Sequence, residues 1–339
     1  MEYKKEEKRK GKPSSLKLLI ILVIFFGFLK GGVTFSSEPK PPLEPRDEIF
    51  SLYFQNNKTG WIVGESGLIV KTTDGGKSWL RQRVETEKAL YDVTFVDNEG
   101  WIVGQEGIIL HSADGGKRWE RQESDTEAAL MSVFFLNKKR GFAVGEGGII
   151  LSTKDRGSTW KQYPLDLMSI LPDSLIERGI ISPNFYDIFF LSNGKGWIVG
   201  DNGIVLFSSD GGKKWEVLRI GLYPSLFSVF FKDDSEGWTV GQNGTILHTI
   251  DGGKIWRRLE TKTEENLYNF CLDENYGIVV GDRGTILISR DGGRSWDKLK
   301  IELKIPLPWF IDVSIIDHAS SGREVICVGE NLIKRLQIR

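Results

Sequence analysis

The chain has 339 residues, of which 39 are glycine and eleven are tryptophan, and aromatic residues make up 11%. Abundant glycine with many aromatic residues is typical of turn-rich, all-β repeat proteins. Residues 1–36 hold eight basic and three acidic side chains, which leaves 37 basic and 43 acidic residues, a net −6, for the rest. The folded part of a nucleic-acid-binding protein usually carries the opposite sign, so we expect no nucleic-acid partner.

The N-terminus has the pattern of a membrane-targeting segment. A basic stretch, Lys4 to Lys12, precedes an unbroken apolar run from Leu18 to Leu29. This run suits a signal peptide, and it becomes long enough to span a bilayer if the flanking Lys17 and Lys30 extend outward. Because no Ala-x-Ala cleavage motif follows, we expect residues 1–32 to remain as a signal/anchor segment, with the rest of the chain exported to the extracytoplasmic side. A cleaved signal peptide is the alternative.

Residues 33–47 form a proline-rich linker, and after it one pattern recurs through residues 48–339. Each copy holds an apolar run, a Gly-Trp-Ile-Val-Gly-type run, a third apolar run and a polar turn that ends in tryptophan. The closing tryptophans, at positions 79, 119, 160, 215, 256 and 296, are 40, 41, 55, 41 and 40 residues apart. A period near 40 with four short β-type runs predicts propeller blades.

The ends of the repeat set the number of blades. The interval of 55 residues places an insertion at about residues 161–183, and a seventh copy begins at Phe310. We therefore predict an all-β fold, a seven-bladed β-propeller of four-stranded antiparallel blades. The seventh copy lacks the pattern of a fourth strand. Residues 33–47 are the candidate to supply it, although their prolines make them a poor ladder partner.

Six copies carry an eight-residue turn of the form Ser/Thr-x-Asp-x-Gly-x-x-Trp. Its aspartate can accept hydrogen bonds from the backbone of its own turn, and its tryptophan can cover the hairpin. Six turns of one kind indicate a structural role. The aspartates and tryptophans are Asp74, Trp79, Asp114, Trp119, Asp155, Trp160, Asp210, Trp215, Asp251, Trp256, Asp291 and Trp296.

This turn matches the Asp box of sialidase-type (BNR) repeats, and Gly-Trp-x-Val-Gly followed by an Asp box resembles the photosystem II stability/assembly factor family. The similarity covers about residues 48–330. The resemblance implies a non-enzymatic propeller that binds a membrane protein or a subunit of a membrane complex and assists its assembly. We expect a monomer without a cofactor, in which Cys271 and Cys327 are buried apolar residues rather than a disulfide.

A carbohydrate-binding or glycoside-hydrolysing surface protein is the alternative function, because sialidases share the Asp box. Glycosidases need two carboxylates that face each other across a cleft, and a sialidase also needs a Phe/Tyr-Arg-Ile-Pro motif, which this sequence lacks. The box aspartates are six-fold redundant, so we predict no catalytic residue. His111 and His248 occupy the same position in two copies, which favours a role on the strand surface, and we predict no metal site.

Small polar residues recur at one position of the first apolar runs. We expect them to hydrogen-bond around the central channel, with a ligand site as the alternative. They are Ser51, Asp92, Ser132, Asp187, Ser228, Asn269 and Asp312.

Three links between blades are unusually apolar, namely the insertion and the segments 218–225 and 299–309. We expect them on one propeller face, opposite the Asp boxes, with the insertion over the channel mouth, and exposed apolar loops of this kind mark partner sites. The alternative is an insertion that packs down as a lid. The predicted partner-binding residues are Leu167, Met168, Ile170, Leu171, Leu175, Ile176, Tyr223 and Trp309.

Overall fold

The computed structural model describes Leu43 and residues 47–171, 173–179, 181–218, 220–221, 224–303, 306–318 and 322–338. Contacts within the chain separate residues 1–38 from a unit of residues 39–339. The anchor segment predicted at residues 1–32 and most of the linker predicted at residues 33–47 lie outside the described residues. No helix in the described ranges is long and apolar enough to cross a bilayer.

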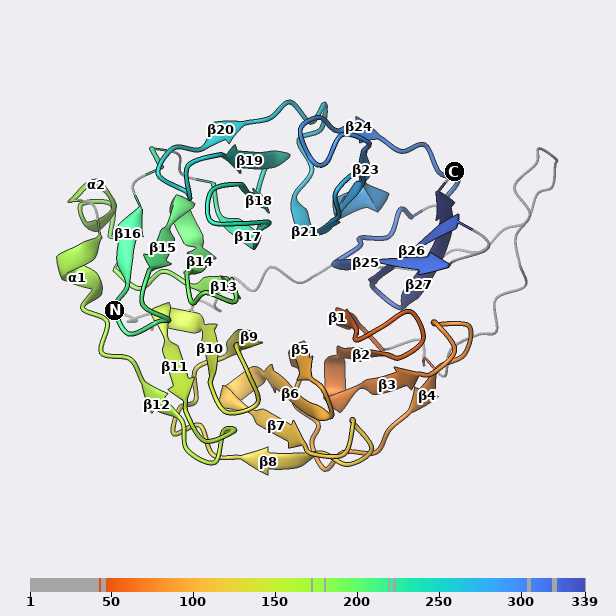
Figure 1. Cartoon of the computed structure of the whole chain (residues 1–339), viewed down its shortest axis with the longest axis horizontal. Coiled ribbons are helices and arrows are strands. Elements are labelled where there is room, and N and C mark those ends of the chain that lie inside the picture. The colour runs from red at the N-terminus through yellow and green to blue at the C-terminus, as the bar shows by residue number, and fades with distance from the viewer. Residues whose placement is uncertain are drawn as a thin grey trace, which may run out of the picture. The chain divides into compact units, whose positions relative to one another are not determined.

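The described residues between positions 47 and 338 form seven antiparallel sheets around a central channel (Figure 1). In the described ranges, six sheets have four strands and the seventh has three. The strands of every sheet pair in chain order, so each blade is a meander whose first strand lies beside the channel. The predicted seven-bladed propeller is confirmed.

The strands fall into four sets from the channel outward. The first strands are β1 (Ile49–Phe54), β5 (Leu90–Val96), β9 (Leu130–Phe135), β13 (Phe185–Phe190), β17 (Leu226–Phe231), β21 (Leu267–Leu272) and β25 (Asp312–His318). The second strands are β2 (Gly60–Gly64), β6 (Glu99–Gly104), β10 (Gly141–Gly145), β14 (Gly196–Gly200), β18 (Gly237–Gly241), β22 (Gly277–Gly281) and β26 (Gly322–Gly329). The third strands are β3 (Ile69–Thr72), β7 (Ile109–Ser112), β11 (Ile150–Thr153), β15 (Val205–Ser208), β19 (Thr245–Thr249), β23 (Ile286–Ser289) and β27 (Leu332–Ile338). The fourth strands are β4 (Leu80–Arg81), β8 (Glu120–Gln122), β12 (Lys161–Gln162), β16 (Glu216–Leu218), β20 (Arg257–Arg258) and β24 (Asp297–Lys298).

The hydrophobic core lies between adjacent blades. The Gly-Trp-Ile-Val-Gly strands are buried along their whole length, because each is covered by a neighbouring blade on both faces. Their tryptophans stack on the first strand of the next blade, with ring centroids 3.5 Å apart for Trp101 and Phe135 and 3.6 Å apart for Trp197 and Phe231. This packing joins the blades into one closed ring.

The first and last blades meet in a cluster of buried side chains that includes Ile49 and Ile62 of blade 1 and Ile326 of blade 7. Leu43 packs against the same cluster and is the one residue described between positions 33 and 46. Most of residues 33–47, which we predicted as the ladder partner of the last blade, therefore fall outside the described residues.

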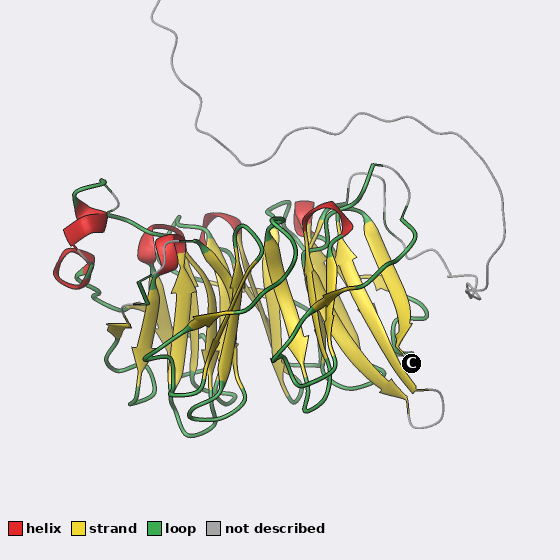
Figure 2. Ribbon diagram, turned by 90° about the horizontal axis from the view of Figure 1, so that it is seen from above, coloured by secondary structure: helices red, strands yellow, loops and turns green. Residues whose placement is uncertain are grey.

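The two faces of the propeller carry different loops, as the side view in Figure 2 shows. On the link face lie the links between blades and the turns between second and third strands; for example, Gln105 N of such a turn donates to Ala89 O of a link at 2.8 Å. On the box face the Asp boxes contact the turns between first and second strands, as in the 2.9 Å bond from Gly115 N to Asn98 O. The placement of the Asp boxes opposite the links is as predicted.

Candidate binding site

The polar residues predicted around the channel form a hydrogen-bonded ring. Ser51 Oγ donates to Asp92 Oδ1 at 3.2 Å, and Ser132 Oγ lies 3.1 Å from Asp92 Oδ2 and 3.0 Å from Asp187 Oδ1. On the other side of the ring, Ser228 Oγ donates to Asn269 Oδ1 at 2.9 Å, and Asn269 Nδ2 donates to Asp312 Oδ1 at 2.8 Å. All seven residues line one cavity of about 460 Å³.

The three ring carboxylates also connect blades through the backbone. Each accepts a bond of 2.7–2.8 Å from a backbone N–H in the first strand of another blade, and the pairs are Val133 with Asp92, Val229 with Asp187 and Leu52 with Asp312. Burial, together with the nearby charge of Asp92, raises the pKa of Asp187 to about 6 and that of Asp312 to about 7. The ring therefore has a structural role in addition to lining the cavity.

A second ring of side chains lies beside the first, and sequence reasoning missed it. Phe50 and Ser51 both line the cavity, although successive residues of a regular strand point to opposite faces. The pairing of β1 with β2 explains this, because Ile49 pairs with Gly64 and Ser51 with Val63, and Phe50 is skipped. A β-bulge of this kind turns a side chain in a new direction, here into the channel.

The same bulge occurs in the first strands of blades 2 to 6. The residues at this position, with Ile311 of blade 7, are called the channel-mouth ring: Phe50, Tyr91, Met131, Tyr186, Phe227, Tyr268 and Ile311. All seven are half-buried and lie at the link-face end of the first strands. Neighbouring rings contact each other, with centroids 5.4 Å apart for Phe50 and Tyr91 and 5.2 Å apart for Tyr186 and Phe227.

Carboxylates lie next to the channel-mouth ring. Tyr186 donates its hydroxyl hydrogen to Asp201 Oδ1 at 2.9 Å, and Tyr268 donates to Asp282 in the same way at 2.9 Å. Both aspartates begin a turn between second and third strands. Burial raises the pKa of Tyr91, and the negative charges of the glutamates at 65 and 146, which begin the same turn in blades 1 and 3, raise it further. The mouth of the channel is thus both aromatic and acidic.

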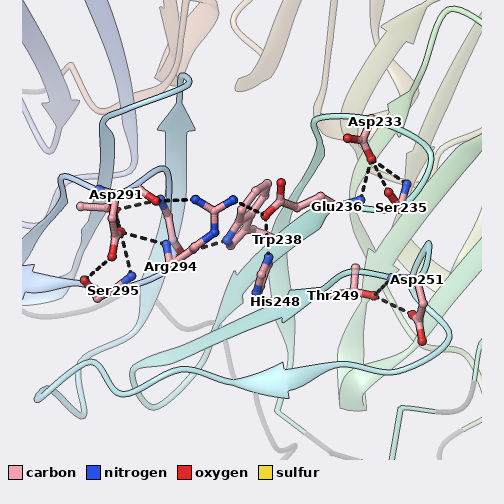
Figure 3. Close-up of polar contacts among 12 residues, drawn as sticks. Asp233, Ser235, Glu236, Trp238, His248, Thr249, Asp251, Asp291, Arg294 and Ser295 are labelled. Atoms are coloured by element: carbon pink, nitrogen blue, oxygen red, sulfur yellow. Dashed lines mark hydrogen bonds and ion pairs between the residues drawn. The ribbon is translucent and has the colours of Figure 1, made fainter.

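The Asp boxes are closed by bonds within each turn, as Figure 3 shows for blade 6. Asp291 Oδ1 accepts from the backbone N–H groups of Arg294 and Ser295 at 3.0 and 2.9 Å, and Oδ2 accepts from Ser295 Oγ at 2.7 Å. Although burial opposes ionisation, the bonds from Ser295 and Ser289 lower the pKa of Asp291 to about 2.

The other five box aspartates also accept bonds from their own turns. The box tryptophans at positions 79, 160, 215, 256 and 296 are buried, whereas Trp119 is half-buried. Because their oxygens are used inside exposed turns on the box face, the box aspartates do not face one another across a cleft.

The two repeated histidines belong to contacts between blades. Glu236 Oε1 lies 3.2 Å from His248 Nε2 and 3.3 Å from Nη2 of Arg294, which belongs to the Asp box of the next blade. Figure 3 shows the three side chains together. Trp238 stacks on the His248 ring at a centroid distance of 4.8 Å.

Blade 2 repeats this arrangement with Glu99, His111, Arg156 and Trp101. Among the described residues, no group of three His, Cys, Asp or Glu side chains is placed to hold a metal ion.

The insertion does not lie where we expected it. It forms two short helices, α1 (Leu167–Ile170) and α2 (Asp173–Ile176), which lie at the outer edge of the propeller beside β16 and not over the channel mouth (Figure 1). The reason is that Leu171 and Leu175, 5% and 2% exposed, pack into the core between blades 3 and 4. The expected position over the mouth was wrong.

The eight predicted partner-binding residues therefore do not form one patch. Leu167 and Ile176 pack against the same core as Leu171 and Leu175, and Met168 is 53% exposed. Trp309 is half-buried in the link between blades 6 and 7, three blades from the insertion. The side chain of Ile170 and the whole of Tyr223 lie outside the described part of the chain.

A comparison with protein families identifies the family of this chain. The profile of the photosynthesis system II assembly factor YCF48 matches residues 40–127 and 176–264, together just over half of the sequence. The chain belongs to the YCF48 family.

Solved structures agree in fold. YCF48 bound to D1 peptide has a TM-score of 0.69 at 20% identity, over 89% of this chain and 96% of that chain. YCF48 from Cyanidioschyzon merolae has a TM-score of 0.67 at 19% identity, over 87% and 97%. The GH74 xyloglucanase from Xanthomonas campestris has a TM-score of 0.69 at 11% identity, over 86% of this chain and 52% of that chain. A search of curated proteins finds no match.

Membership of the YCF48 family supports an assembly factor rather than an enzyme. The likeness to the xyloglucanase, at 11% identity, is a likeness of fold alone. In this chain the channel carboxylates Asp92, Asp187 and Asp312 accept bonds from backbone N–H groups of other blades. The main role of these carboxylates is therefore to hold the blades together.

Proposed function

We propose that this YCF48-family propeller is a non-enzymatic assembly factor that binds a segment of a membrane protein at its channel mouth. The observation that carries the proposal is the channel-mouth ring, in which bulges turn a half-buried, mostly aromatic side chain into the channel in six of the seven blades. Aromatic residues on a rigid scaffold are typical anchors for a partner. YCF48 bound to D1 peptide is a relative that holds a peptide.

The dimensions of the site suit a short segment rather than a folded domain. A cavity of about 460 Å³ lies within the range of sites that enclose a small ligand or a few side chains. Its walls are held by the hydrogen-bonded ring, so the site is formed before a partner arrives and little ordering entropy opposes binding. The exposed Met168 and the half-buried Trp309, on links of the same face, would contact parts of the partner outside the channel.

We further propose that the propeller is held on the extracytoplasmic side of a membrane by residues 1–32. The support is the basic stretch followed by the apolar run Leu18–Leu29 and the lack of an Ala-x-Ala motif after it. N-terminal sequencing of the membrane-bound protein should find the segment intact. A mature chain that begins near Ser36 would contradict the retained anchor.

Client capture tests the proposed site. The tagged full-length chain is purified from gently solubilised membranes of its host, and proteins that co-purify are identified by mass spectrometry. An integral membrane protein should accompany the natural chain, and its yield should fall at least about tenfold with Tyr91→Ser/Phe227→Ser, because these changes remove two channel anchors.

Tyr276→Ser supplies the matched control, because Tyr276 is a half-buried aromatic residue in the turn between β21 and β22, on the box face. It should leave the yield unchanged. Equal yields from the channel variant and the control would reject the site. Binding of the natural chain to a glycan array, lost in the channel variant, would favour the carbohydrate alternative.

A further inference from the structure

The cavity at the channel mouth has a one-sided charge. Three of its lining residues are carboxylic acids, Asp92, Asp187 and Asp312, and none of the described residues that line it is lysine or arginine. The cavity also lies at the centre of a chain whose residues beyond position 36 carry a net −6. A ligand group with negative charge would be repelled here, and a positive group would be attracted.

The turns around the mouth add further carboxylates. The first residue of the turn between second and third strands is acidic in four of the five turns that the structure shows as 3₁₀, namely at Glu65, Glu146, Asp201 and Asp282. Glu65 N donates to Glu48 O at 2.8 Å and Glu146 Oε2 accepts from Ala129 N at 3.3 Å, and both of these partners lie two residues before a side chain of the channel-mouth ring. Asp201 and Asp282 accept bonds from Tyr186 and Tyr268. These four carboxylates are therefore close to the channel-mouth ring.

Aromatic rings complement these charges. The face of a tyrosine or phenylalanine ring attracts a cation, and combining several rings with carboxylates is a common way to bind an ammonium or guanidinium group. This chain uses such contacts elsewhere. Lys71 Nζ lies 4.9 Å from the centroid of the Trp61 ring, and the Arg323 guanidinium lies 4.7 Å from that of Tyr276.

We infer that the channel mouth binds a basic side chain, lysine or arginine, of an extended peptide segment, with the cation between the rings of the channel-mouth ring and the carboxylates around it. This inference rests on the proposed function, because it names the chemistry of the segment that the propeller binds. The apolar stem of the basic side chain contacts Phe50, Met131 and Phe227, and its charged end lies near Tyr91 and the ring carboxylates. An acidic or purely apolar segment does not satisfy these groups.

The chain itself supplies a structurally neutral way to remove the charge. In blades 2 and 5 the first residue of the turn is glutamine, and Gln105 Oε1 and Gln242 Oε1 each accept a 3.2 Å bond from the backbone N–H of the link. Glu146 Oε2 accepts the equivalent bond from Ala129 N at 3.3 Å. Glu65→Gln/Glu146→Gln should therefore keep the fold and change only the charge at the mouth.

The experiment measures peptide binding to the full-length chain in mild detergent by fluorescence anisotropy. The probe is a labelled nine-residue Gly/Ser peptide that contains two arginines, and the matched peptide carries citrulline, which has nearly the same shape without the charge. The arginine peptide should bind at least about tenfold more tightly than the citrulline peptide. Glu65→Gln/Glu146→Gln should weaken arginine-peptide binding about three- to tenfold.

Glu120→Gln/Glu216→Gln is the matched control, because it changes the net charge equally at exposed positions of the outer strands β8 and β16. It should leave binding unchanged. Equal affinity for the arginine and citrulline peptides, or an equal loss with the control variant, would overturn the inference. If that occurs while Tyr91→Ser/Phe227→Ser still abolishes client capture, the basic-segment inference alone fails and the proposed function stands.

Discussion

The backbone N–H of Leu52, in the first blade, donates a 2.7 Å hydrogen bond to Oδ2 of Asp312, in the last blade, across 260 positions of the chain. Ile49 N donates to Glu330 O at 3.0 Å across the same boundary. In the described part of the chain, the ring is therefore closed by hydrogen bonds and packing. One of the groups that closes it is a carboxylate whose pKa is raised to about 7 by burial.

The first prediction concerns the pH dependence of stability. The pKa values of Asp187 and Asp312 are raised in the folded chain, so between about pH 4 and pH 7 the folded state holds protons that the unfolded state has lost. Their contribution to stability is present below pH 4 and is lost as pH rises through 6 to 7. The free energy of unfolding, from urea titration, should fall by about 1 kcal/mol or more between pH 5 and pH 8.

Asp312→Asn should remove the larger part of this pH dependence, because Asp312 has the higher pKa, and Asp187 should retain the rest. Asp234→Asn, at an exposed position, serves as the control and should preserve it. An unfolding free energy that is constant from pH 5 to pH 8 would show that the two carboxylates are not perturbed as described.

The second prediction compares two box tryptophans. Trp160 and Trp119 make the same bond, from Nε1 to a glutamine of the preceding blade, at 3.3 and 3.2 Å. They differ in burial, because Trp160 is 5% exposed and Trp119 is half-buried. Trp160→Ala should therefore lower the free energy of unfolding by ~3–5 kcal/mol, and Trp119→Ala by clearly less. Equal losses in urea titration would mean that burial does not decide the contribution.

The third prediction concerns the contact between blades 5 and 6. Glu236→Ala removes the shared partner of His248 and Arg294 and should cost ~1–3 kcal/mol of unfolding free energy. A double-mutant cycle with His248→Ala should give a coupling of at least about 0.5 kcal/mol. Glu216→Ala, at an exposed position on β16, should have little effect, and a cost for Glu236→Ala no larger than this control would argue against the contact.

The fourth prediction uses two glycines that are two residues apart. A Cβ on Gly145 would lie 1.9 Å from the carbonyl oxygen of Ala129, so Gly145→Ala should strongly destabilise blade 3. Gly147 has a φ of +67° but open space around it, and other blades have Asn202 or Asn243 at this position with φ near +55°.

Gly147→Asn should therefore change the free energy of unfolding by less than about 0.5 kcal/mol. Thermal unfolding of the two variants distinguishes them. A large loss with Gly147→Asn would indicate a constraint on this turn beyond its backbone conformation.

The repeat made the fold predictable, because every blade has the same pattern of strands and turns. An ambiguous segment in one copy can therefore be assigned from the equivalent segments of the other copies. It also predicted the polar ring, since Ser51 and its six equivalents occupy one position of the repeat. The channel-mouth ring was missed for a physical reason. Regular strand alternation places Phe50 away from the channel if Ser51 faces it, and only the pairing with β2 reveals the bulge. A signal was available, because five of the seven residues at that position are aromatic.

The insertion was misplaced for a different reason. Apolar side chains in a link suggest an exposed binding surface, but in a long link they can equally fill the gap between two blades. Leu171 and Leu175 do so. Composition alone does not distinguish an insertion that packs on its own propeller from one that binds a partner, because both bury apolar side chains.

The odd number of blades has a consequence for the hydrogen-bonded ring of polar residues in the channel. Serine hydroxyls in blades 1, 3 and 5 donate, and aspartates in blades 2 and 4 accept. With an odd number of blades, this alternation cannot close without two groups of the same kind side by side. Asn269 of blade 6 resolves the mismatch, because its oxygen accepts from Ser228 and its amide nitrogen donates to Asp312. Aspartate there would place two acceptors side by side, so this position needs a side chain that both accepts and donates. A ring of six or eight blades could alternate serine and aspartate throughout, so the combined donor and acceptor at Asn269 is a consequence of the odd number of blades.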